Sequence, residues 1–183
     1  MNEVMRMDEA QMVGASIVNP EPVRWHAHWR VDKYSGAYDG EDIASGRAGQ
    51  PYEVVEGDGN LLTTTGCTTL WNGLTGVAIT NFGSANANLG VGDGTAAAAV
   101  GQTDLQASTN KVRVGQDSTY PQISGSTCQF KSTYGNGTAE FAWQEWGVFN
   151  GTAAGTMLNR KVASLGTKGA GATWTLTVTL GLA

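Results

Sequence analysis

The chain has 183 residues, of which 26 are Gly, and only 15% are charged. Its net charge is −5 and its eleven Lys and Arg residues are scattered singly, which argues against a cationic surface for nucleic-acid phosphates. No window of about 18 apolar residues exists, and residues 1–12 contain four charged side chains instead of an export signal. We therefore expect a soluble protein with no nucleic-acid partner and no membrane partner.

Charge divides the chain near residue 60. Residues 1–60 hold eleven acidic and five basic residues, whereas residues 61–183 hold five acidic and six basic ones. Three of the four prolines lie in the first part and break any long helix there. We expect an extended, acidic and irregular N-terminal arm over residues 1–59 and a β-rich domain over residues 60–183.

One segment of the arm, Arg24 to Val31, has strong strand character. In a strand, Trp25 and Trp29 share one face, while His26 and His28 share the other. Exposed tryptophans on an arm with little core of its own would be unfavourable, and Trp is common among interface anchors. Trp25 and Trp29 are therefore expected to dock, either into the chain's own domain or into a neighbour.

The elements expected after residue 60 are short. The spacing of apolar residues predicts one helix over about 62–75, and Thr103 resembles the N-cap of a helical turn at 104–107. Apolar runs bounded by Gly, Asn and Asp predict strands at 77–82, 89–91 and 111–114.

Two Asn-Gly dipeptides mark turns in the C-terminal third. Asn136-Gly137 lies between the apolar segments 129–134 and 139–149, and this dipeptide favours a tight hairpin because both residues accept positive φ. Asn150-Gly151 opens the connection to a further strand at 157–163. Both dipeptides fit the glycosylation acceptor pattern, but the turns explain them sufficiently.

The last segment, 173–182, alternates large apolar residues with Thr and predicts an amphipathic antiparallel strand. Several short strands, frequent turn residues and little helix together indicate a mainly β fold. We expect an antiparallel β-sandwich or a jelly-roll-like domain with one or two short helices, beside the N-terminal arm.

Metal and nucleotide motifs are weak. The run from Gly90 to Thr95 lacks the glycine spacing and the Lys-Ser/Thr pair of nucleotide loops, so it indicates a strand that ends in a turn. His26 and His28 would point the same way, but a zinc site would need Cys67, Cys128 or a carboxylate to complete it. The two cysteines are interpreted as separate small hydrophobic residues rather than as a disulfide. We expect no cofactor and no metal.

Catalytic groups are not indicated either. Glu140 and Glu145 lie five residues apart and fall on opposite faces of a strand, so they do not converge on one bond. Asp39, Glu41 and Asp42 lie in a Gly-rich stretch typical of a solvated turn, with calcium as a weaker alternative. Since no Ser-His-Asp or Cys-His pairing is indicated, the sequence predicts no catalytic residue and no enzyme.

Trp143 and Trp146 are candidate interface residues. They are three positions apart and therefore fall on opposite faces of a regular strand, so at most one can lie in the core. The other would be exposed or at an interface. With Trp25 and Trp29 they complete the set of interface candidates.

An ordered set of motifs over about residues 60–183 resembles a pattern found in virion structural proteins of tailed bacteriophages. The motifs run Asn60-Leu-Leu, Leu70-Trp71, Leu89 to Ala99, Gln102 to Ala107, Phe141 to Asn150, Thr156 to Val162 and Trp174 to Leu180.

The resemblance implies a non-enzymatic building block of the virion, assembled in the host cytoplasm. It implies a homo-oligomer, a trimer or another symmetric assembly, in contact with the major capsid protein or with tail proteins. An exterior capsid decoration or stabilising protein is the first expectation, because neighbours would pin an irregular arm. A tail-collar or tail-fibre component is the alternative. So is a host-receptor or carbohydrate-binding module in which Trp143 or Trp146 stacks on sugars.

Overall fold

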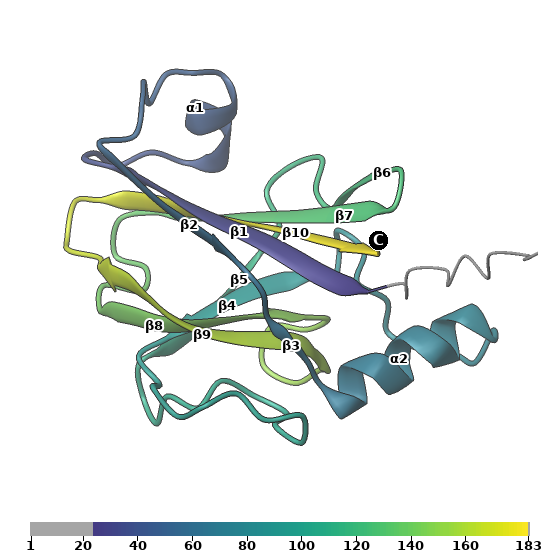
Figure 1. Ribbon diagram of the computed structural model, residues 1–183. Coiled ribbons are helices and arrows are strands. Elements are labelled where there is room, and N and C mark those ends of the chain that lie inside the picture. The colour runs from purple at the N-terminus through teal and green to yellow at the C-terminus, as the bar shows by residue number, and fades with distance from the viewer. Residues whose placement is uncertain (1–23, 183) are drawn as a thin grey trace, which may run out of the picture.

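The fold is a sandwich of two five-stranded antiparallel sheets, and the computed structural model describes residues 24–182 (Figure 1). The sheets lie face to face, with the hydrophobic core between them. This architecture confirms the predicted mainly β class and the sandwich.

The first sheet, sheet A, contains both ends of the described chain. Its strands β1 and β10 pair along their whole length, from Trp25 opposite Leu182 to Tyr34 opposite Thr173. Its strand order is β2 (Glu53–Asp58), β1 (Trp25–Tyr34), β10 (Thr173–Leu182), β7 (Thr127–Tyr134) and β6 (Gln122–Ser124).

The structure corrects the predicted arm over residues 1–59. Residues 25–58 contribute β1 and β2 to sheet A, so the sandwich begins before residue 60. Charge and proline content could not reveal this, because β1 is held by hydrogen bonds to β10, at the other end of the sequence. Residues 1–23 of the predicted arm lie outside the described residues.

The second sheet, sheet B, corrects one predicted hairpin. The turn at Asn136-Gly137 does not join paired strands, because β7 belongs to sheet A and the next strand to sheet B, although Gly137 has the expected positive φ of 78°. Asn150-Gly151 does open a hairpin between paired strands. The order of sheet B is β3 (Leu61–Leu62), β9 (Met157–Thr167), β8 (Ala142–Phe149), β4 (Asn88–Gly92) and β5 (Lys111–Gly115).

Two helices complete the described chain. α2 (Thr64–Leu74) confirms the predicted helix, and α1 (Gly40–Ala44) is capped by Asp39, whose side chain accepts a hydrogen bond from the Asp42 amide at 2.8 Å. The acidic stretch is therefore a helix cap. The predicted strand at 77–82 and helical turn at 104–107 do not form.

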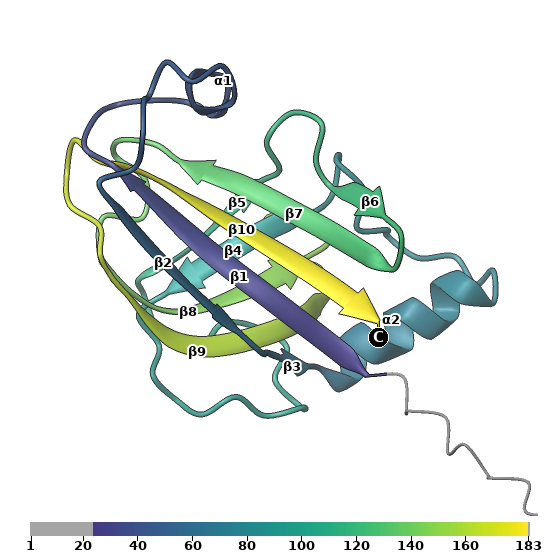
Figure 2. The ribbon, with the colours of Figure 1, turned by 45° about the horizontal axis from the view of Figure 1, so that its top comes forward.

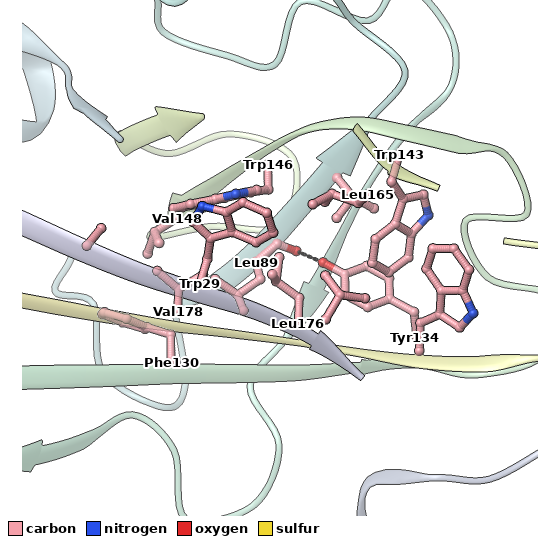
Figure 3. Close-up of a cluster of buried hydrophobic side chains, with 14 of the residues drawn as sticks. Trp29, Leu89, Phe130, Tyr134, Trp143, Trp146, Val148, Leu165, Leu176 and Val178 are labelled. Carbon is pink, nitrogen blue, oxygen red and sulfur yellow. Dashed lines mark hydrogen bonds between the residues drawn. The ribbon is translucent and has the colours of Figure 1, made fainter. Parts of the chain in front are cut away.

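The core is rich in tryptophan. Trp143 packs edge-on against Tyr134 and Trp174, with ring centroids 4.7 and 5.0 Å apart. The Tyr134 hydroxyl donates a hydrogen bond of 2.7 Å to the carbonyl oxygen of Leu89, which links the two sheets (Figure 3). Trp29 of β1 is buried in the same cluster.

Three of the four interface candidates therefore lie in the core. Trp143 and Trp146 are both fully buried, because the pairing of β8 with β9 shifts register between Trp143 and Glu145 and so breaks the alternation of a regular strand. Trp29 docks into the chain's own domain, one of the two outcomes expected for it. Only Trp25 is partly exposed.

Candidate interaction surface

Helix α2 lies against β9 through its first turn. Thr63 is its N-cap, with a hydroxyl that accepts from the Gly66 amide at 2.9 Å and donates to the Met157 carbonyl at 2.6 Å. A Cβ atom at Gly66 would collide with the backbone of Leu158. Glycine at this position therefore allows the helix to approach the sheet closely.

The large apolar side chains of α2 are exposed to solvent. Its two buried residues are Gly66 and Thr69, whereas Leu70, Trp71 and Leu74 are 41%, 61% and 76% exposed. These three positions are spaced as neighbours on one helix surface. An ordinary amphipathic helix buries its large apolar residues, so α2 has the opposite arrangement.

Helix α2 lies beside the end of sheet A where β1 begins and β10 ends (Figure 2). An apolar groove of about 640 Å³ is lined by residues of these elements. We call it the α2 groove. The most exposed of its large apolar lining residues is Ile123 of β6, at 81%. Of the described residues, those that line the groove include no Asp, Glu, Lys, Arg or His. The large side chains are Trp25, Leu70, Phe82, Ile123, Phe130, Leu158, Leu180 and Leu182.

Trp25 and Cys128 give the groove two defined features. The indole Nε1 of Trp25 donates to Asn60 Oδ1 at 2.9 Å, which fixes the ring beside the groove. Cys128 is a free thiol, and burial raises its pKa. Cys67 is also free, and neither cysteine forms a disulfide with the other.

Sequence reasoning identified Trp25 but missed the rest of this surface. The helix over 62–75 was predicted without its orientation. The one signal available was Leu-Trp at 70–71 in a helix interrupted by Gly66, since a glycine in a helix can mark a close approach to a neighbour.

The histidines lie on the other face of β1. Nδ1 of His28 lies 3.0 Å from Oδ1 of Asp58, and both side chains are exposed to solvent. Within residues 24–182, no group of three or more His, Cys, Asp or Glu side chains is placed to hold a metal ion. Over the same residues, no helix is long and apolar enough to cross a membrane.

A second polar cluster lies on the outer face of sheet B, beneath the β4–β5 loop (residues 93–110). Glu145 is completely buried, and its carboxylate accepts from Arg160 Nε at 2.6 Å and from the amides of Gln106 and Ala107 at 3.0 and 2.7 Å. These loop amides bind the carboxylate, and the predicted helical turn at 104–107 is replaced by an irregular segment.

Two glycines of β4, Gly90 and Gly92, allow the close packing between sheet B and the β4–β5 loop. A Cβ atom at Gly92 would lie 2.7 Å from Glu145 Oε1, and one at Gly90 would lie 2.7 Å from the ring of Phe149. Glycines in β4 therefore leave room for the groups beneath the β4–β5 loop. Both carboxylate oxygens of Glu145 accept hydrogen bonds from within the fold, so we assign this cluster a structural role.

Asp104 holds the outer part of the same loop and makes stability depend on pH. Burial raises the pKa of Asp104, but hydrogen bonds from Lys111 and Arg113, both 2.7 Å, outweigh it and leave the pKa below its ordinary value. A depressed pKa adds stability above the ordinary Asp value, and this stability is lost as the pH falls through the folded-state pKa. Asp104→Asn should therefore lose less stability on acidification than the wild type, as measured by urea unfolding across the acid range.

Asp117 provides the control of opposite sign. Burial raises the pKa of Asp117, against the hydrogen bonds that the Thr133 amide and hydroxyl donate to it. Folding therefore favours the protonated form of Asp117. As the pH falls from the raised pKa to the ordinary pKa, protonation of Asp117 stabilises the fold and offsets part of the stability lost at other carboxylates. Asp117→Asn should steepen the acid loss. Equal slopes in both variants would contradict the assignment.

Comparisons with protein-family models, with curated proteins and with solved structures give no match for this chain.

Proposed function

We propose that this chain is a non-enzymatic structural component of a tailed-phage particle, an exterior capsid decoration or stabilising protein that acts by symmetric self-association. The observation that carries the proposal is that helix α2 exposes its large apolar residues Leu70, Trp71 and Leu74 beside an apolar groove. Contiguous exposed apolar surface of this kind is typical of an interaction site. The resemblance of residues 60–183 to phage virion proteins supplies the biological setting.

The partner at this surface is a protein rather than a small molecule. A volume of about 640 Å³ lies within the range of ligand pockets. However, Trp71 and Leu74 do not line the groove, so the exposed apolar surface extends past it along the helix. Trp is also among the residues most enriched at the energetic centres of protein interfaces.

Symmetric assembly suits such a surface. In a closed assembly each copy repeats the same contact, so a modest interface stabilises the whole particle. A tail-collar or tail-fibre component would use the same surface, and its position in the particle distinguishes it from a capsid component. The carbohydrate-binding alternative loses its two candidate residues, since neither Trp143 nor Trp146 is exposed to a ligand.

Replacing Trp71 and Leu74 together by Ser is expected to weaken self-association strongly without unfolding the chain. Interface anchors of this type cost about 2 kcal/mol or more, which is roughly 30-fold in Kd. Sedimentation velocity over a concentration series measures the effect. Tyr52→Ser is the matched control, because Tyr52 is 58% exposed and its amide donates to the Lys33 carbonyl, near the end of β1 remote from the groove. A wild type that stays monomeric and does not bind particles would contradict the proposal.

Labelling intact phage particles with an antibody against this chain tests whether the chain is a capsid component. Label over the heads is expected. Label confined to tails would replace the capsid role by the tail-collar or tail-fibre role, and unlabelled particles that lack the chain would overturn both.

A further inference from the structure

The α2 groove lies where the described chain starts and ends. Trp25, the first residue of β1, and Leu182, the last residue of β10, both line it. A further 24 residues precede Trp25 in the sequence. The N-terminal segment is therefore covalently attached at the edge of an open apolar groove, a position from which it can reach such a groove.

The chemistry of one part of that segment matches the groove. Residues 12–18 read Met-Val-Gly-Ala-Ser-Ile-Val and contain no charge, whereas residues 1–9 intersperse Val and Met with four charged residues. The described lining of the groove contains no charged residue either. An uncharged apolar segment can enter it without leaving a charge unpaired and desolvated.

The lengths also agree. Helix α2, with eleven residues, is about 16 Å long, and about five extended residues cover that distance. Residues 12–18 are long enough to lie along the groove beside the helix. Val13, Ile17 and Val18 would supply the large side chains.

The sequence between this segment and β1 favours a neighbouring copy as the acceptor. Pro20 and Pro22 fix their own φ, and Asn19 and Glu21, which precede them, are restricted to extended backbone. Residues with these backbone restrictions disfavour a tight reversal of the chain. The sequence before β1 therefore favours the groove of a neighbouring copy over the groove of the same chain.

We propose that residues 12–18 of one copy occupy the α2 groove of a neighbouring copy. This inference rests on the self-association in the proposed function and names the segment that produces it. Exchange of an arm between copies covers the apolar lining of the groove and links each protomer to the next.

A disulfide between the segment and the groove tests the proposal, because Cys128 already lines the groove. Ile17→Cys is made in the full chain together with Cys67→Ser, and the protein is treated with diamide. The two thiols lose two protons and two electrons to diamide, which is reduced to the hydrazine as the S–S bond forms. Because burial raises the pKa of Cys128, the reaction is run at mildly alkaline pH.

Covalent dimers and higher species on a non-reducing gel are the expected result, with a yield that rises with protein concentration. They should disappear when Cys128→Ser is added. Val4→Cys, at a position outside the uncharged segment, is the matched control and should cross-link far less. An intramolecular disulfide, seen as a monomer two hydrogens lighter in mass, would overturn the assignment to a neighbouring copy.

A second variant needs no thiol chemistry. Ile17→Asp in the otherwise wild-type chain is expected to weaken self-association by roughly tenfold or more, because it brings a charge into an apolar groove. Unchanged association would overturn the proposal. Cross-linking in solution supports the groove assignment whether or not antibodies find the chain on particles, so the two proposals fail separately.

Discussion

Glu145→Gln is expected to lower the free energy of unfolding by about 3–5 kcal/mol, since it breaks a buried ion pair and leaves one charge without its partner. Arg160 is 1% exposed, and its Nε is 2.6 Å from the carboxylate. Its other nitrogens donate to Gln102 Oε1 at 3.0 Å and to the Ala96 carbonyl at 2.9 Å. Loss of the carboxylate charge therefore weakens the attachment of the β4–β5 loop to the sheet.

Guanidinium unfolding measures this effect, and two variants control it. Lys111→Ala removes one partner of Asp104 at the surface, and it should cost less than about 1 kcal/mol because exposed ion pairs contribute little. Glu145→Met combined with Arg160→Met removes both charges and should be less destabilising than Glu145→Gln. It should not regain full stability, since the Gln106 and Ala107 amides lose their acceptor. A loss below about 1 kcal/mol in Glu145→Gln would contradict this account.

Trp143→Ala should cost about 3–5 kcal/mol, because it opens a large cavity in the core. The indole is fully buried, it packs against Tyr134 and Trp174, and its Nε1 donates to the Ala139 carbonyl at 2.9 Å. Truncation removes the apolar contacts and one of the two hydrogen bonds that the Ala139 carbonyl accepts, the other being from the Phe141 amide at 2.9 Å.

Trp71→Ala is the matched control for the core tryptophan. Trp71 is 61% exposed, so its replacement should change the unfolding free energy by no more than about 0.5 kcal/mol. The same variant should weaken self-association, whereas Trp143→Ala should act through stability. Thermal unfolding of dilute protein and sedimentation separate the two. Loss of sugar binding by a fully stable Trp143→Ala protein would revive the carbohydrate-binding alternative.

An isolated copy of the chain exposes several large apolar side chains on α2 and β6. Trp71, Leu74 and Ile123 are among the most exposed large apolar side chains of the described residues. An isolated copy presents them to water, and covering them by a second copy or by another protein would be favourable. This is the physical basis on which assembly and the arm exchange are proposed.

Local pattern was sufficient for much of the fold. Alternation over 173–182 predicted β10, and the parity of Arg24 to Val31 correctly separated Trp25 and Trp29 from the two histidines, which lie on the opposite, exposed face. The helix at α2 also followed from the spacing of its apolar residues. In each case neighbouring residues along the chain determine which side chains share a face.

Pairing between distant segments required the tertiary structure. Asn136-Gly137 predicts a turn correctly, but the two strands that it joins lie in different sheets, since β7 pairs with β10 and β8 pairs with β9. The register shift after Trp143 likewise depends on β9, and it buries a second tryptophan that regular alternation would expose.

The sequence by itself determined the mainly β class, the strand at each end of the described chain and the helix at α2. Only the tertiary structure decided which strands pair, which tryptophans lie in the core and which side of α2 meets β9. The reason is physical. Alternation and helical spacing are properties of adjacent residues, whereas sheet membership, register and helix orientation depend on contacts such as Gly66 against Leu158, which lie far apart in the sequence.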